Sequence, residues 1–157
     1  MTPTPLQARR ALIVIDVQNE YESGGLRIQY PPIAESLRNI GRAMDAAHAA
    51  GIPIIVAQQS APATAPLFAT GSPGWQLHPV VSARPYDHHL RKTLPSAFAD
   101  TDLGPWLQAH AIDTAKAVSR ARKHSPSRFT AASSRLVTRM AVPRRTSQIS
   151  IPTCSPR

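Results

Sequence analysis

Polar side chains follow two apolar runs of the sequence, and their types and positions could support chemistry. Asp16 comes directly after residues 11–15, and the Gln-Gln-Ser sequence at 58–60 follows the apolar residues 52–57. If both runs are parallel strands, these side chains meet at one edge of a sheet, where open α/β sheets bind their ligands. Asp16 has an ordinary alternative as a turn or capping residue satisfied by backbone N–H groups. Position alone does not decide between the two.

The cysteine and two adjacent histidines are weaker candidates for a nucleophile and for metal ligands. The single cysteine, Cys154, excludes an internal disulfide and a multi-thiolate metal site. It lies three residues before the end of the sequence, with no strand predicted before it and no helix after it. Because a nucleophile must be held to within about 0.5 Å, we expect Cys154 to be an exposed free thiol. His88 and His89 are adjacent on a predicted strand, so they point to opposite faces and are not expected to share a metal ion.

A strand, a helix and a second strand must position these side chains. Residues 11–15 form an unbroken, β-branched apolar run, which is typical of a strand buried on both faces. A helix follows and ends at Gly51, while residues 52–57 form the second strand. This βαβ unit predicts parallel strands and the α/β fold class. The apolar side chains at helical spacing are Ile33, Leu37, Ile40, Met44 and Ala47.

The rest of the body contains a long connection and one more helix. Residues 60–85 are rich in Pro and Ala and lack a repeat, so we expect an irregular active-site or interface loop. Thr101 is predicted to cap a helix that packs on the sheet. The inward-facing side chains expected for that helix are Leu103, Trp106, Leu107 and His110.

Length and charge limit the classes of protein. The 157 residues suffice for one domain, and the net charge is +9. All nine acidic residues lie within residues 1–113, whereas residues 114–157 carry ten basic residues and no acidic one. The charge therefore belongs to a tail rather than to a nucleic-acid-binding body. Without an apolar run of about 18 residues or a signal-like segment at residues 1–10, we expect a soluble cytoplasmic protein with no membrane partner.

Four segments have an order and spacing that match a known family. They are ALIVIDVQNEY at 11–21, AAGIP at 49–53, GSPGWQLHP at 71–79, and LRKTLPSAF at 90–98 with Thr-Asp-Leu at 101–103. Together they resemble the isochorismatase-like cysteine hydrolases, a superfamily that also holds nicotinamidases and related amidohydrolases. The resemblance covers residues 11 to about 113. It implies a three-layer, doubly wound α/β fold with a mostly parallel sheet.

The resemblance also implies a reaction, the hydrolysis of a C–N bond in a small amide or related molecule by a Cys, Asp and Lys constellation. Carried over by motif, the base that takes the thiol proton is Asp16, and the residue that stabilises the thiolate is Lys92. Lys92 has an alternative as a surface residue beside Arg91. Tyr21 and Trp75 are candidate walls of the substrate cavity, although either could be a core aromatic.

No cofactor or metal is expected. Nicotinamidase-type members carry an Asp-x-His metal motif just after the second strand, whereas residues 58–62 here read Gln-Gln-Ser-Ala-Pro. This departure from the family pattern also argues against nicotinamide as the substrate.

The resemblance stops at Thr114, where the family pattern continues with a buried strand, a glycine and the nucleophilic cysteine. Residues 114–157 have no glycine or acidic residue, and their only cysteine is Cys154. Such a segment is a basic arm for nucleic acid or anionic surfaces, a disordered extension, or the product of a frame shift near codon 114, which we favour. We therefore expect an incomplete fold that lacks its nucleophile and aggregates or relies on a partner such as a second copy. The alternative is a non-catalytic pseudoenzyme with a basic tail.

Overall fold

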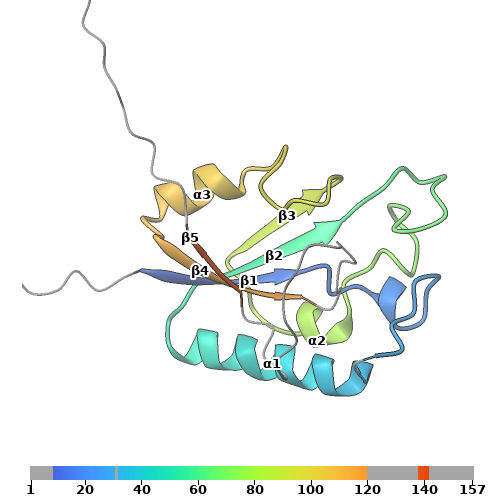
Figure 1. Cartoon of the computed structure of the whole chain (residues 1–157), viewed down its shortest axis with the longest axis horizontal. Helices are drawn as coiled ribbons and strands as arrows, with labels where there is room; N and C mark the ends of the chain where they lie inside the picture. The colour runs from blue at the N-terminus through green and yellow to red at the C-terminus, as the bar shows by residue number, and fades with distance from the viewer. Residues whose placement is uncertain (1–8, 31, 120–137, 142–157) are drawn as a thin grey trace, which may run out of the picture.

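The computed structural model describes residues 9–30, 32–119 and 138–141, which form one sheet with helices on both faces (Figure 1). The strand order is β3-β2-β1-β4-β5. The first four strands in that order are mutually parallel, and β5 is antiparallel to β4. The predicted α/β fold with a mostly parallel sheet is therefore confirmed. The strands are β1 (Arg10–Ile15), β2 (Ile54–Gln59), β3 (His88–Lys92), β4 (Thr114–Ser119) and β5 (Thr138–Ala141).

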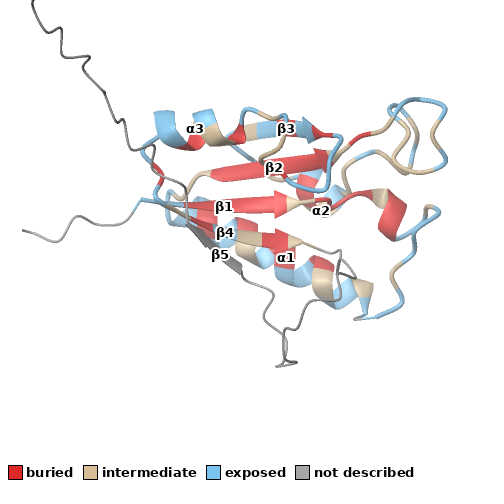
Figure 2. Cartoon of the chain, turned by 45° about the horizontal axis from the view of Figure 1, so that its top comes forward, coloured by how far each residue is buried: buried red, intermediate tan, exposed pale blue. Residues whose placement is uncertain are grey.

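Two hydrophobic clusters, one on each face of the sheet, explain the unbroken apolar runs. Helices α1 (Ile33–Ala49) and α2 (Pro79–Ser82) lie on one face, and α3 (Leu103–Ala109) lies on the other (Figure 1). Leu12 and Val14 pack into the first cluster, and the intervening Ile13 packs into the second. Strands β1 and β2 are buried along most of their length (Figure 2). Alternation across a strand thus requires apolar side chains at all four buried positions of β1, residues 11–14.

Helix α1 follows the predicted apolar spacing. Four of the five predicted positions, from Leu37 to Ala47, are buried, and Ile33 at the first turn is partly exposed. Gly51 adopts φ +63°, the left-handed conformation expected after the helix. The chain then enters β2 two residues later than predicted, at Ile54.

The long connection and the third helix differ in detail from the prediction. Residues 60–85 contain the short helix α2, whose N-cap His78 accepts the amide of Val80 at 3.1 Å. Asp102 is the N-cap residue of α3 but makes no side-chain cap bond, and the hydroxyl of the predicted cap, Thr101, accepts the Leu103 amide at 3.4 Å. His110 was wrongly expected to face inward; it follows the last turn, is exposed, and stacks on Trp106 with ring centroids 3.9 Å apart. His110 is the C-cap residue, outside the helix, so helical spacing no longer places its side chain on the inward face.

The sheet continues beyond the position where the resemblance was expected to stop. Residues 114–119 form β4, which pairs with β1 from Arg10↔Thr114 to Ile15↔Ser119 and buries Ala115 and Val118. Residues 120–137 and 142–157, with Cys154, lie outside the described part of the chain. The interpretation of that part as a basic or frame-shifted tail stays a prediction.

Candidate active site

Two of the predicted site residues meet at the carboxyl edge of the sheet. Asp16 follows β1, and Lys92 is the last residue of β3, two strands away. The Lys92 Nζ atom lies 3.0 Å from Asp16 Oδ1, and their side chains are only 1% and 4% exposed. The alternative that Lys92 is a surface residue is therefore wrong. Parallel strands end at one edge of a sheet, which is why residues far apart in the sequence form this pair.

The Lys92 ammonium has three acceptors around it. Besides Asp16, the Gln59 Oε1 atom lies 2.6 Å from Nζ and the Leu94 carbonyl oxygen lies 3.4 Å away. Taking an ammonium and a carboxylate out of water is strongly unfavourable unless the geometry is good and the remaining hydrogen-bonding capacity is used. Gln59 and Leu94 accept hydrogen bonds from the ammonium, and Asp16 supplies the opposite charge.

The backbone of Asp16 is strained. Its φ is +57°, a left-handed conformation that non-glycine residues adopt rarely, although Asp tolerates it better than most. Its amide nevertheless continues the ladder between β1 and β2 by donating to the Ala57 carbonyl at 2.9 Å. Such strain persists only where the surroundings fix it, and it concentrates at functional sites.

Tyr21 lies close to the Asp16 carboxylate. It ends a short 3₁₀ helix, Asn19–Tyr21, and is 6% exposed, with its ring centroid 5.3 Å from that of Phe68. Burial first, and then the negative charges of Asp16 and Glu20, raise the pKa of Tyr21 well above its ordinary value. The phenol therefore keeps its proton to a higher pH than an exposed tyrosine does.

Trp75 joins the long loop to the ends of the strands. Its indole N–H donates to Ser60 Oγ at 2.9 Å, and the Arg91 guanidinium lies 4.9 Å from the ring centroid. Its carbonyl accepts the side-chain amides of Gln18 and Gln58 at 2.7 and 2.8 Å. The ring is partly exposed. Whether Tyr21 and Trp75 contact a substrate stays a prediction.

Glu20 is a buried carboxylate that the sequence analysis missed. It is 5% exposed and accepts the backbone amides of Gly25 at 2.5 Å and Phe68 at 3.3 Å. A Cβ atom on Gly24 or Gly74 would overlap the Glu20 side chain. Glycines in both loops around a glutamate were the available signal, because they let two backbones approach one carboxylate.

The two adjacent histidines point to opposite faces, as predicted. His88 Nε2 lies 3.1 Å from Asp102 Oδ1, and His89 Nε2 lies 2.9 Å from Gln58 Oε1. Burial, together with the charges of Arg91 and His88, lowers the pKa of His89. Among the described residues, no three or more His, Cys, Asp or Glu side chains are grouped so that they could hold a metal ion. In that same part of the chain, no helix is long and apolar enough to cross a bilayer.

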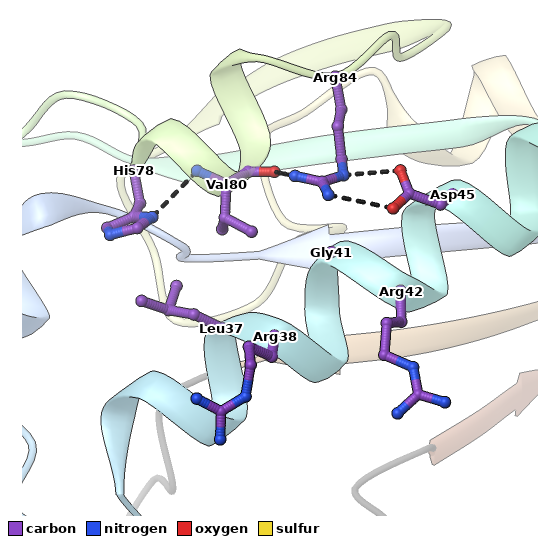
Figure 3. Close-up of a pocket in the computed structure, with 8 residues that line it drawn as sticks. All are labelled: Leu37, Arg38, Gly41, Arg42, Asp45, His78, Val80 and Arg84. Atoms are coloured by element: carbon purple, nitrogen blue, oxygen red, sulfur yellow. Dashed lines mark hydrogen bonds and ion pairs between the residues drawn. The ribbon is translucent and has the colours of Figure 1, made fainter.

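A groove of about 390 Å³ lies between α1 and α2, and none of the predicted site residues line it (Figure 3). Arg84 spans it, donating to both carboxylate oxygens of Asp45 at 2.7 and 3.0 Å and to the Val80 carbonyl at 2.9 Å. This hydrogen bonding lowers the pKa of Asp45 and raises that of Arg84. The remaining lining residues are Leu37, Arg38, Gly41, Arg42 and His78.

The mostly parallel α/β sheet thus carries a buried carboxylate and ammonium at its carboxyl edge, where open α/β sheets bind their ligands. The family model of the isochorismatase domain matches residues 10–118. The chain therefore belongs to the isochorismatase family.

Known proteins from three organisms are similar to this chain. A crystal structure of a Burkholderia xenovorans LB400 protein assigned to the isochorismatases is 62% identical, with a TM-score of 0.66 over 68% of this chain and 51% of that one. Streptothricin hydrolase of Streptomyces noursei is 36% identical over 103 residues, 66% of this chain and 36% of the relative. The secreted isochorismatase effector Isc1 of Verticillium dahliae is 34% identical over 97 residues, 62% of this chain and 50% of the relative. The matched part of this chain thus spans between about a third and a half of each relative.

Proposed function

We propose that residues 10–118 carry the charged half of a cysteine hydrolase site, acting on a C–N bond of a small amide-containing molecule. The observation that supports it best is the buried ion pair between Lys92 Nζ and Asp16 Oδ1, 3.0 Å apart at the carboxyl edge of the sheet. Both residues occupy family motifs inside the matched range. The partner of such a site is its small-molecule substrate.

In this mechanism Asp16 is the general base and Lys92 its electrostatic partner. Asp16 takes the proton of a cysteine thiol, and the thiolate attacks the amide carbon to form a C–S bond. The C–N bond then breaks, and the amine leaves with the proton that Asp16 held. Water hydrolyses the thioester to a carboxylic acid and regenerates the thiol. Lys92 stabilises the thiolate and the negative charge that develops on the substrate oxygen.

The two aromatic residues are proposed as walls of the substrate cavity. Tyr21 would present a hydroxyl group whose pKa burial and the Asp16 charge raise. Trp75 would present an indole face fixed by Ser60 and Arg91. An aromatic wall with one polar contact is typical of small-molecule sites.

No metal or cofactor is part of the proposal. A thiol, a carboxylate and an ammonium suffice for this reaction. The place of the family's Asp-x-His metal motif is taken here by residues 58–60, and Gln59 Oε1 accepts a hydrogen bond from Lys92. A cytoplasmic location also stays a prediction, and one curated relative is named a secreted effector.

We further propose that the chain as encoded lacks the nucleophile. The family match ends at residue 118. Residues 119–157 contain no glycine, and Cys154 is their only cysteine. Of the strand, glycine and cysteine that the family pattern predicts here, only the strand, β4, is present among the described residues. A departure from the reading frame just after β4 accounts for this pattern. A nucleotide sequence whose alternative frame encodes a glycine and then a cysteine would support it, and one without them would contradict it.

Hydrolysis by the purified full chain tests the proposed loss of activity. Streptothricin and a panel of small primary amides serve as substrates, the Streptomyces noursei enzyme is the positive control, and release of amine or ammonia is measured. We expect no thiol-dependent turnover by the chain or by its Cys154→Ser variant. Turnover that Cys154→Ser abolishes would make Cys154 the nucleophile. Turnover that survives this change would require a different nucleophile, and either result contradicts the proposal.

A further inference from the structure

A set of side-chain amides links the ends of the three strands that hold the ion pair. Gln18 lies two residues after Asp16 and is fully buried, and Gln59 ends β2 between the strands of Asp16 and Lys92. Gln18 binds the backbone of Gln59, and Gln59 binds the ammonium of Lys92. With the ion pair, these contacts form a closed circuit from the Asp16 turn through β2 to the end of β3.

The Gln18 side chain makes the pair of hydrogen bonds to Gln59 that the backbone of a neighbouring strand residue would make. Its Oε1 atom accepts the Gln59 amide at 2.9 Å, and its Nε2 atom donates to the Gln59 carbonyl at 2.9 Å. The second N–H of Nε2 reaches the Trp75 carbonyl at 2.7 Å. Gln18 thus uses both N–H donors and one acceptor to fix the backbone of Gln59 beyond the last regular pair of β1 with β2.

Only one orientation of the Gln59 amide fits its neighbours. Nε2 donates to the Thr93 carbonyl at 3.1 Å, and Oε1 faces Lys92 Nζ at 2.6 Å. The reversed amide would aim its N–H donors at the ammonium and its oxygen at a carbonyl, so the surrounding groups select the orientation. The Thr93 carbonyl directly follows Lys92 in the sequence, and Gln59 therefore binds both the ammonium and the backbone next to it.

We propose that Gln18 and Gln59 are positioning residues that hold the Lys92 ammonium against the Asp16 carboxylate. The importance of this role for catalysis rests on the proposed function. Gln59 accepts a hydrogen bond without adding a charge. The ammonium therefore keeps a single carboxylate partner among the three acceptors described above, and the pair keeps a net charge of zero. A carboxylate at position 59 would compete with Asp16 for Lys92 and would place a second negative charge beside it.

The experiment measures how fast the Lys92 ammonium protons of the full chain exchange with water. The chain has three lysines, Lys92, Lys116 and Lys123, so ¹⁵Nζ-lysine labelling gives at most three ammonium signals. Lys116→Arg and Lys123→Arg variants assign them, and the exposed Lys116 is the reference. We expect the Lys92 protons of the unmodified chain to exchange far more slowly than those of Lys116. Equal rates would overturn the proposal without any variant at position 59.

Gln59→Met keeps the length of the side chain and removes the acceptor. Because the ammonium then lacks one hydrogen-bond acceptor, we expect Lys92 exchange to accelerate by about tenfold or more. Gln59→Asn, which keeps the amide but shortens its reach, should give a smaller acceleration in the same direction. Gln58→Met is the matched control, because Gln58 is adjacent and 2% exposed but binds Trp75 and His89.

Backbone amide exchange separates positioning from a general loss of stability. If Gln59 only stabilises the fold, its loss accelerates hydrogen exchange of the backbone amides of β1, β2 and β3 together with exchange of the Lys92 ammonium. If Gln59 positions the ammonium, only the exchange rate of Lys92 increases. Gln59 variants that leave Lys92 exchange unchanged, or a Gln58→Met variant that accelerates it as much, would overturn the proposal. The readout needs no turnover, so failure of the hydrolase proposal in the activity assay remains distinguishable from failure of this one.

Discussion

Two ion pairs of similar length lie in very different surroundings, at the carboxyl edge of the sheet and in the groove between α1 and α2. Lys92 and Asp16 are 3.0 Å apart with side chains 1% and 4% exposed, while Arg84 and Asp45 are 2.7 Å apart with side chains 29% and 60% exposed. The second pair spans an open groove in contact with solvent (Figure 3). Distance alone therefore says little about what an ion pair does for the protein.

Burial determines the difference. An exposed pair contributes little because water and salt screen it and its long side chains lose freedom. A buried pair is costly to desolvate, and each member depends on the other for compensation. The strained backbone of Asp16 lowers the stability of the fold at the sheet edge, and the surrounding side-chain amides hold the charged groups in a fixed geometry there. No comparable backbone strain occurs at Asp45 or Arg84.

The largest expected effect is that of removing the buried cation. Lys92→Met leaves the Asp16 carboxylate buried without its ammonium, and we expect a loss of about 3–5 kcal/mol in the free energy of unfolding. Urea unfolding followed by circular dichroism measures it. The matched control is Arg84→Met in the exposed pair, which should change the urea midpoint little. Equal losses in the two variants would remove the distinction between the pairs.

A second change should restore much of what the first one loses. The double variant Asp16→Asn with Lys92→Met removes both charges, and Asn tolerates the left-handed backbone of Asp16. We expect a double-mutant cycle from the same urea curves to give a coupling energy of about 2 kcal/mol. Additive losses would mean that the two charges do not depend on each other.

Alkaline pH should act on the sheet edge through Tyr21. Its raised pKa means that the folded state keeps the phenolic proton at a pH where the unfolded chain has lost it. The corresponding stability is complete below pH of about 10 and is lost as the pH rises further. Absorbance at 295 nm during a pH titration should show one late-ionising fraction that Tyr21→Phe abolishes. A titration of the same shape in both proteins would contradict this prediction.

The exposed pair should give the smallest effect. Hydrogen bonding to Arg84 lowers the pKa of Asp45, so the related stability is present above the ordinary pKa of about 3.9 and is lost as the pH falls through the lowered value. NMR titration of Asp45 should show its pKa rising towards the ordinary value in Arg84→Met. The urea midpoint at neutral pH should stay nearly unchanged, and a large shift would show that this pair also supports the fold.

The first half of the fold was predictable from the sequence because its signals are local. An unbroken apolar run, a helical period and a glycine at a left-handed position specify β1, α1 and β2 without knowledge of their neighbours. Strand β4 was missed because Thr-Ala-Lys-Ala-Val-Ser is rich in alanine, has a charged residue inside and joins a basic segment. Its burial comes from pairing with β1, which no local pattern reports.

The site was predictable only in part. Asp16 was a candidate from its position after the first strand, but its role and Lys92 followed from family motifs, since no spacing relates residues on non-adjacent strands. The roles of Gln18 and Gln59 depend on which backbone groups lie opposite their amides, and that requires the loop geometry. Glu20 was missed for the same reason, because its partners Gly25 and Phe68 come from two different loops.

The central claim is that the buried pair is half of a cysteine hydrolase site, and a chimera tests it most directly. Residues after Ser119 are replaced by the corresponding part of the Burkholderia xenovorans relative, and thiol-dependent amide hydrolysis is measured with and without Asp16→Asn. Loss of a general base lowers a rate by about 10²–10⁴-fold, so we expect kcat/KM to fall by at least about 100-fold while the variant stays folded. A folded Asp16→Asn chimera that hydrolyses the amide at an unchanged rate would contradict the account.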